Sequence, residues 1–235
     1  MHKAFIVCAP RTRSTLLTAT LGSHPDVCAL PEMNWAYGTV GKLLDFAFSD
    51  ANKYFMLYGP IRAIAKLWAG EETTLGCMEA LRFLLNHREL PIQMVMNILH
   101  EKSGKKVLLE KSPSSSLIET IYPDVKYILL SRSDELVKES LKEMPNITDL
   151  MAEQEILKKS RNSLQYLRDN RQHLDIDAED FVQNTEAVLR KICDFLDIEY
   201  VEMKSENWDF AKPGVWFAQY GGDPIFMHNP VMRKD

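Results

Sequence analysis

The 235 residues of the chain are enough for one large α/β domain with a sizeable core. A formal net charge of -5 argues against a general nucleic-acid binder, since such proteins usually carry a basic excess. The first residues lack the apolar core of a signal peptide, and no apolar run approaches the ~18 residues of a membrane span. We therefore expect a cytoplasmic protein without a membrane span.

Three apolar runs have the composition of buried strands, and they occupy residues 4–9, 106–110 and 125–131. Each run is followed by polar turn residues and then by a helix-like pattern, which is the rhythm of a parallel sheet covered by helices. A weaker strand at 26–32 would complete a βαβ unit with the first run. The sequence thus predicts a three-layer α/β fold with a central parallel sheet.

The remaining segments are predicted to cover and extend this sheet. Residues 33–105 are mainly helical in pattern, with a break at 58–60, and we interpret them as an insertion that shapes a pocket. The segments that follow read as a charged helix at 149–172, a short strand and turn at 175–181, a helix at 185–196 and an irregular tail from 206. Because no repeat or linker interrupts the chain, we expect a single domain over residues 1–235.

The junction between the first strand and its helix has the composition of an anion site. Its sequence, APRTRSTLL at 9–17, places two arginines and three hydroxyl side chains where a helix begins. Free N–H groups and the helix dipole attract anions at such a terminus, and guanidinium groups bind phosphate or sulfate in a forked geometry. Alternatively, Thr12 or Ser14 is only an N-cap and the arginines are surface charges. Neither GxxxxGK[ST] nor GxGxxG is present.

Three segments together resemble the sulfotransferase family. APRTRSTLL resembles the family's 5'-phosphosulfate loop, and YILLSRSDELVKESL at 127–141 resembles its 3'-phosphate segment, with Arg132 at a strand end and Ser140 eight positions later. AEDFVQNTEAVLRKICDFLDIEY at 178–200 is similar to a late family segment of the type YEDL followed by a helix. The resemblance implies a P-loop-like sulfotransferase fold, with residues 33–105 forming the acceptor pocket.

The resemblance also implies a donor and the residues that hold it. The donor would be 3'-phosphoadenosine 5'-phosphosulfate (PAPS), which gives its sulfuryl group to a hydroxyl or amine without a metal. Arg11 would bind the 5'-phosphosulfate with four neighbours, and Arg132 and Ser140 would bind the 3'-phosphate. The four neighbours are Thr12, Arg13, Ser14 and Thr15. Because Arg13 replaces a common glycine, we expect side chains more than backbone amides to hold the anion.

Transfer also needs a base, and two carboxylates compete for that role. Glu32 lies where bacterial and Golgi-type sulfotransferases carry a catalytic glutamate, and the carboxyl edge of a parallel sheet faces the ligand crevice. Lys111, in LLEKSPSS, stands where cytosolic relatives have a catalytic histidine. An ammonium group is better suited to stabilising the leaving oxygen than to accepting the acceptor's proton. Glu110 is the second candidate base, although strand alternation places it on the opposite face from Lys111.

Two other functions share the expected sheet and remain open. A P-loop-like kinase or nucleotide hydrolase would need a magnesium ligand and the missing lysine signature. A non-catalytic binding module would keep the nucleotide fold without turnover. The six histidines show no ligand-pair spacing, although His24 was expected near the active edge. We expect the acceptor to be a small molecule, a glycan or a lipid, and no motif distinguishes these classes. Residues 215–226 are a candidate lid, with Gly221 and Gly222 as hinges. No feature of the sequence specifies the oligomeric state.

Overall fold

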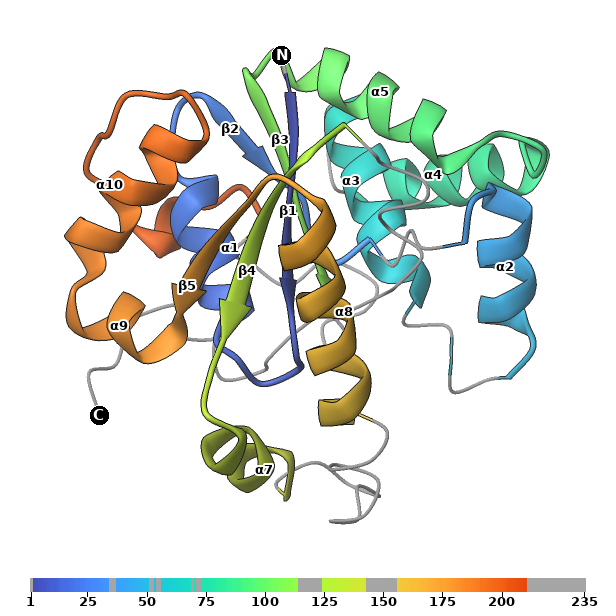
Figure 1. Cartoon of the computed structure of the whole chain (residues 1–235). Coiled ribbons are helices and arrows are strands. Elements are labelled where there is room, and N and C mark those ends of the chain that lie inside the picture. Colours follow the sequence, from blue (N-terminus) through green and yellow to red (C-terminus); the bar gives the residue numbers. More distant parts are fainter. Residues whose placement is uncertain are drawn as a thin grey trace.

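The core of the fold is a five-stranded parallel sheet with strand order β2-β3-β1-β4-β5 (Figure 1). The computed structural model describes residues 2–33, 37–50, 53, 56–68, 70, 73–113, 124–142 and 156–210. The strands are β1 (His2–Cys8), β2 (Val27–Ala29), β3 (Val107–Pro113), β4 (Lys126–Ser131) and β5 (His173–Asp177). The predicted α/β fold with a central parallel sheet is therefore confirmed, including the weak strand at 26–32.

Helices cover both faces of the sheet. On one face, α1 (Ser14–Gly22), α9 (Ala178–Gln183) and α10 (Thr185–Phe195) pack over it (Figure 1). On the other face lie α2 (Val40–Phe48), α3 (Tyr58–Trp68), α4 (Thr74–Asn86), α5 (Ile92–Ser103) and α8 (Lys158–Asn170). The short helix α7 (Asp134–Lys142) lies beyond the carboxyl end of β4 (Figure 1).

The central strands are largely apolar because both of their faces are buried. Along β1, Phe5 and Val7 contribute to the core under α2–α5, whereas Ala4 and Ile6 contribute to the core under α1, α9 and α10. The same alternation runs along β3 and β4, as expected for a period of two residues. Charged residues enter β3 from its midpoint onward, at Glu110 and Lys111, so the groups available for chemistry lie toward the carboxyl edge of the sheet.

The helical segment between β2 and β3 is organised by local caps. The side chain of Thr39 accepts a hydrogen bond from the N–H of Lys42 at 3.3 Å, and Thr73 accepts one from Gly76 at 3.1 Å. Residues 58–60, which we predicted to be a break, instead form the first turn of α3. A proline is tolerated there because its missing N–H has no partner within the first turn of a helix.

The end of the last strand was predicted too far along the chain. β5 stops at Asp177, and residues 178–181, expected to belong to the strand and its turn, form most of α9. The Asp177 carboxylate accepts hydrogen bonds from the N–H groups of Glu179 and Asp180, both at 2.9 Å, so it caps this helix. The charged helix predicted at 149–172 is described from Lys158 as α8, and residues 143–155 lie outside the described residues.

A 3-10 turn, η3 (Ser205–Asn207), closes the edge of the sheet beyond β2. The indole N–H of Trp208 donates to the carbonyl oxygen of Ala29 at 2.7 Å, and a Cβ at Gly22 would collide with its ring. Gly22 therefore allows α1 and Trp208 to pack closely. The predicted lid at 215–226 lies outside the described residues.

Two further features concern the whole described part of the chain. No helix in it is both long enough and apolar enough to cross a membrane. All four cysteines, Cys8, Cys28, Cys77 and Cys193, are free thiols that pack in the interior. They act there as small apolar side chains.

Candidate functional site

The loop between β1 and α1 holds its shape without a glycine. Arg11 and Arg13 both adopt left-handed backbone conformations, with φ of 66° and 60°. This conformation costs a non-glycine residue energy, of order 1–3 kcal/mol, and such strain clusters at functional sites. The Thr12 hydroxyl donates to the carbonyl oxygen of Ala9 at 2.8 Å and braces the turn. Both arginine side chains are thereby projected from the carboxyl edge of the sheet.

The N-cap interpretation of the hydroxyl residues is wrong. The N-cap of α1 is Arg13, whose carbonyl oxygen accepts the N–H of Leu17 at 3.1 Å. Thr12 is buried in the loop and Ser14 is buried at the first position of α1, while Thr15, the next helical residue, is half-buried. The structure therefore leaves Arg11, Arg13 and Thr15 as the more accessible members of the predicted 5'-phosphosulfate group.

Arg132 and Ser140, predicted to share one phosphate, both contact Arg11. The Nε of Arg11 donates to the Ser140 hydroxyl on α7 at 2.9 Å. The Nη1 of Arg132, just beyond β4, donates to the main-chain oxygen of Arg11 at 3.2 Å. The structure thus joins the β1 loop to the end of β4 and to α7, which both lie more than 100 residues further along the sequence.

A carboxylate that the sequence did not assign to the site pairs with this cluster. Glu179, in the first turn of α9, accepts a hydrogen bond from Nε of Arg132 at 2.7 Å. The same oxygen lies 3.4 Å from Nε of Arg13. No motif in the sequence marked Glu179 as a site residue. Its position directly after a strand that pairs with β4 was the available signal, since neighbouring parallel strands bring their carboxyl ends together.

Glu32 and Lys111 form an ion pair at the same edge of the sheet. Oε2 of Glu32 lies 2.5 Å from Nζ of Lys111, and Nζ also lies 3.4 Å from the Thr15 hydroxyl. Burial lowers the pKa of Lys111, but the nearby Glu32 carboxylate and other negative groups outweigh burial and raise the pKa above its ordinary value. Lys111 is therefore a cation at neutral pH, next to both a carboxylate and the β1 loop.

The main chain of Glu32 is held against the first turn of α3. A Cβ at Gly59 would collide with the carbonyl oxygen of Glu32, so only a glycine permits this close approach. The break predicted at 58–60 therefore marks a real requirement for glycine, although the residues are helical. The contact fixes the backbone from which the Glu32 carboxylate extends to Lys111.

Glu110 lies on the opposite face of β3 from Lys111, as strand alternation predicted. Its side chain is only 1% exposed, and its Oε1 accepts the N–H of Met33 at 3.3 Å. Burial, followed by the neighbouring Glu32 carboxylate, raises the pKa of Glu110 well above its ordinary value, while the Met33 N–H and Lys111 oppose this shift. Glu110 is thus buried and turned away from the Lys111 side of the strand, whereas Glu32 contacts Lys111, which favours Glu32 over Glu110 as the base.

The raised pKa of Glu110 predicts how stability changes with pH. Above the ordinary pKa of a glutamate the folded chain holds this proton more tightly than the unfolded chain does, so the free energy of unfolding falls as pH rises toward the folded pKa. Glu110→Gln lacks this proton. We expect the stability of the native chain to fall relative to this variant by up to about 1.4 kcal/mol per pH unit within that window.

Urea unfolding of both proteins over a series of pH values from about 4.5 upward measures this difference. The stability of the variant would change less with pH, and the gap between the two curves isolates Glu110. Two parallel curves would show that Glu110 is ionised in the folded protein and would reopen it as the base.

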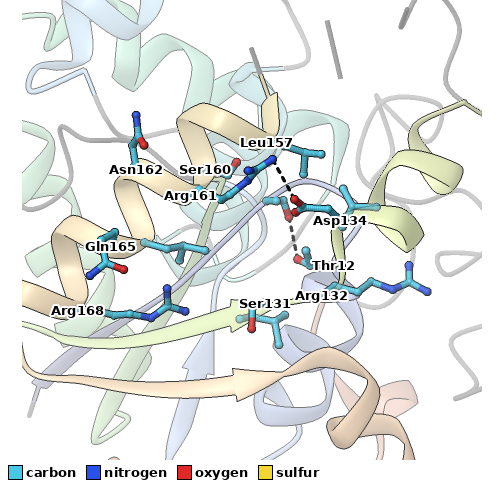
Figure 2. Close-up of a pocket in the computed structure, with 14 residues that line it drawn as sticks. Thr12, Ser131, Arg132, Asp134, Leu157, Ser160, Arg161, Asn162, Gln165 and Arg168 are labelled. Atoms are coloured by element: carbon cyan, nitrogen blue, oxygen red, sulfur yellow. Dashed lines mark hydrogen bonds and ion pairs between the residues drawn. The ribbon is translucent and has the colours of Figure 1, made fainter. Parts of the chain in front are cut away.

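A cavity of about 410 Å³ lies next to the arginine cluster, between the end of β4, α7 and α8 (Figure 2). Thr12 and Arg132 line one side, but the guanidinium of Arg132 points away from α8 in this view. Arg161 on the α8 side pairs with Asp134 at 2.9 Å, and Arg168 pairs with Asp175 at 2.8 Å. Arg13 and Arg132 are likewise paired with a carboxylate, so ion pairing does not distinguish the two places. The loop cluster differs from the cavity in that Arg11, Arg13 and Arg132 lie together there.

His24 does not lie near the site, contrary to expectation. It precedes β2, so it lies at the amino end of the strands, and its Nε2 lies 2.7 Å from the carbonyl oxygen of Glu199. Its Nδ1 accepts the N–H of Asp26 at 3.0 Å. His24 is therefore a structural residue. Within the described ranges, no group of three or more histidine, cysteine, aspartate or glutamate side chains is arranged to hold a metal ion.

Two solved structures share the fold: a sulfotransferase domain from the curacin biosynthetic pathway (TM-score 0.80, 21% identity, 99% of this chain and 88% of that one) and one from the Synechococcus PCC 7002 olefin synthase (0.78, 24%, 100% and 85%). No curated protein matches in sequence. The model of the sulfotransferase family matches residues 4–202. The chain therefore belongs to the sulfotransferase family.

Proposed function

We propose that the protein transfers the sulfuryl group of PAPS to a hydroxyl or amine of an acceptor. The observation that carries this proposal is the grouping of Arg11, Arg13 and Arg132 beside the Glu32–Lys111 pair at one edge of the sheet. Thr15 connects the two groups, because it follows the arginine loop and contacts Lys111. The arginines can thus bind a polyanionic donor next to the carboxylate that accepts the proton.

Each residue has a chemical role in this proposal. Arg11 and Arg13, with Thr12, Ser14 and Thr15 shaping their loop, bind the 5'-phosphosulfate. Arg132 and Ser140 bind the 3'-phosphate. The forked guanidinium groups provide fixed positive charge toward oxygens on which charge accumulates during transfer.

Transfer then follows an in-line course. The Glu32 carboxylate takes the proton of the acceptor hydroxyl as that oxygen forms a bond to sulfur. The bond between sulfur and the bridging oxygen breaks, and adenosine 3',5'-bisphosphate (PAP) leaves. The Lys111 ammonium neutralises the charge that develops on the bridging oxygen. No step requires a metal ion, since side chains supply the positive charge.

The two alternative functions fit these residues less well. A kinase or nucleotide hydrolase would use magnesium at a strand-end carboxylate. Here the strand-end carboxylates Glu32 and Glu179 are paired with Lys111, Arg13 and Arg132. A non-catalytic module would bind the nucleotide but would have no need for the Glu32–Lys111 pair. We expect the acceptor to be a small molecule, a glycan or a lipid. In this proposal it binds against the helical segment that follows Glu32.

Formation of PAP from PAPS tests this function. We expect the native chain to release PAP above the uncatalysed rate in buffer containing EDTA, slowly with water as acceptor and faster with a matching member of a panel of alcohols and amines. Liquid chromatography of the nucleotides gives the rate. A chain that binds PAP tightly yet releases none from PAPS with any acceptor would instead be a nucleotide-binding module.

A further inference from the structure

The carboxylate of Glu179 occupies the centre of the donor cluster, where a repulsive effect on an anion would be expected. A single oxygen of this side chain contacts Nε of Arg132 at 2.7 Å and lies 3.4 Å from Nε of Arg13. Both guanidinium groups are largely buried, with side-chain exposures of 13% and 22%. A negative charge in this position lowers the local positive potential, so its presence needs a compensating benefit.

That benefit is orientation. Arg13 extends from the loop after β1 and Arg132 from the end of β4, and Nη1 of Arg132 contacts the main-chain oxygen of Arg11 in that loop. Glu179 adds a second link, which joins the two guanidinium groups themselves. Two like charges in a partly buried place repel each other and would turn apart. An oxygen shared by both groups cancels this repulsion. The Glu179 oxygen also accepts the hydrogen bond from Nε of Arg132. The Nη groups of Arg132 then face Arg11, and Nη1 donates to the main-chain oxygen of Arg11.

Glu179 is itself held in place by Asp177 at the end of β5. The Asp177 carboxylate accepts the N–H groups of Glu179 and Asp180, and Asp177 pairs in register with Ser131, the residue that precedes Arg132. The carboxylate is therefore attached to the same edge of the sheet as its partner. Groups that are fixed before binding lose less conformational entropy when the ligand arrives.

We propose that Glu179 is a positioning residue for the donor nucleotide, which pre-orients Arg13 and Arg132 toward the 5'- and 3'-phosphates. This inference rests on the proposed PAPS-dependent function. It predicts a result opposite in sign to simple electrostatics. Removal of a negative charge from a cationic site would by charge alone strengthen the binding of a polyanion, whereas loss of orientation weakens it.

Isothermal titration calorimetry of PAP and of adenosine 5'-monophosphate (AMP) tests the inference, because it needs no acceptor. Glu179→Ala removes both charge and acceptor oxygen, and we expect its Kd for PAP to rise about tenfold, the order of one charge-assisted hydrogen bond. Glu179→Gln keeps an oxygen for Nε of Arg132 and should lie between the native chain and the alanine variant. Asp180→Asn removes an equal charge one position away and should leave the Kd within about twofold, since Asp180 contacts Asn184 rather than an arginine.

The comparison with AMP separates positioning from a loss of folding. Because Arg132 is assigned to the 3'-phosphate, the preference for PAP over AMP should shrink in Glu179→Ala, whereas a general structural defect would weaken both nucleotides alike. Equal or tighter binding of PAP by Glu179→Ala and Glu179→Gln would overturn the inference. If the alanine variant does not fold, the sign of the change in Glu179→Gln decides by itself. Failure of the native chain to bind PAP would instead refute the proposed function.

Discussion

Replacement of Glu32 by glutamine should reduce the rate of PAP formation from PAPS by roughly 10² to 10⁴, the usual contribution of a general base. The amide keeps the size of the side chain and still reaches toward Lys111, but it cannot accept the acceptor's proton. Because Glu32 pairs with Lys111 rather than with the arginine cluster, the affinity for PAP should stay close to native. Steady-state rates and calorimetric Kd values of the two proteins give both quantities.

The same experiment separates the two candidate bases. Glu110 is buried and accepts the N–H of Met33, so it is out of line with the Lys111 side of the strand. If Glu32→Gln retained the native rate while Glu110→Gln lost it, the assignment of Glu32 would be wrong and Glu110 would take its place. A lower rate accompanied by an equally large loss of PAP affinity would indicate a damaged donor site rather than a missing base.

Arg132→Ala should weaken PAP binding by about 1.5 to 3 kcal/mol, the value of hydrogen bonds to a charged group. This corresponds to roughly a 10- to 150-fold increase in Kd. Two effects add in this variant. The assigned contact with the 3'-phosphate is lost, and the main-chain oxygen of Arg11 and the Glu179 carboxylate each lose the hydrogen bond from Arg132. Thermal unfolding with and without PAP measures the change, since at about 100 times the native Kd the ligand-induced stabilisation should fall from about 2.7 kcal/mol to roughly 0.3–1.4 kcal/mol.

Arg161→Ala provides the matched control for that experiment. Arg161 is also an arginine near the end of β4, but it lies across the cavity on α8 and pairs with Asp134. Its loss removes the same charge and nearly the same volume outside the proposed donor cluster. A comparable loss of PAP stabilisation in both variants would show that PAP senses only the overall charge and would argue against a specific role of Arg132.

The sheet and the anion loop could be predicted from sequence for a physical reason. Strands buried on both faces must be continuously apolar, and this signal marked β1, β3 and β4. The loop at 9–17 carries its charges at the junction where a parallel sheet presents ligands, so its place at the carboxyl edge followed from local order alone. The ends of elements were less exact, because residues 178–181 form a helix only through the cap at Asp177.

Contacts between distant segments could not be predicted in this way. The pairing of Glu179 with Arg13 and Arg132 depends on β5 lying beside β4. The position of Glu32 depends on the close approach of its main chain to Gly59 in α3. Glu179 was not assigned to the site and Gly59 was predicted to lie in a break, because local sequence does not contain the partner of either residue. The strained backbone at Arg11 and Arg13 was also not evident, since these residues do not favour that conformation.

The measurement that tests the central claim most directly is the binding of PAP to the native chain in magnesium-free buffer, followed by thermal unfolding. The account predicts that PAP at about 100 times its Kd stabilises the fold by about 2.7 kcal/mol without any metal ion. It also predicts that most of this effect requires Arg132. Absence of any shift with PAP, together with a clear shift from a nucleoside triphosphate and magnesium, would contradict the account and favour a kinase-like enzyme.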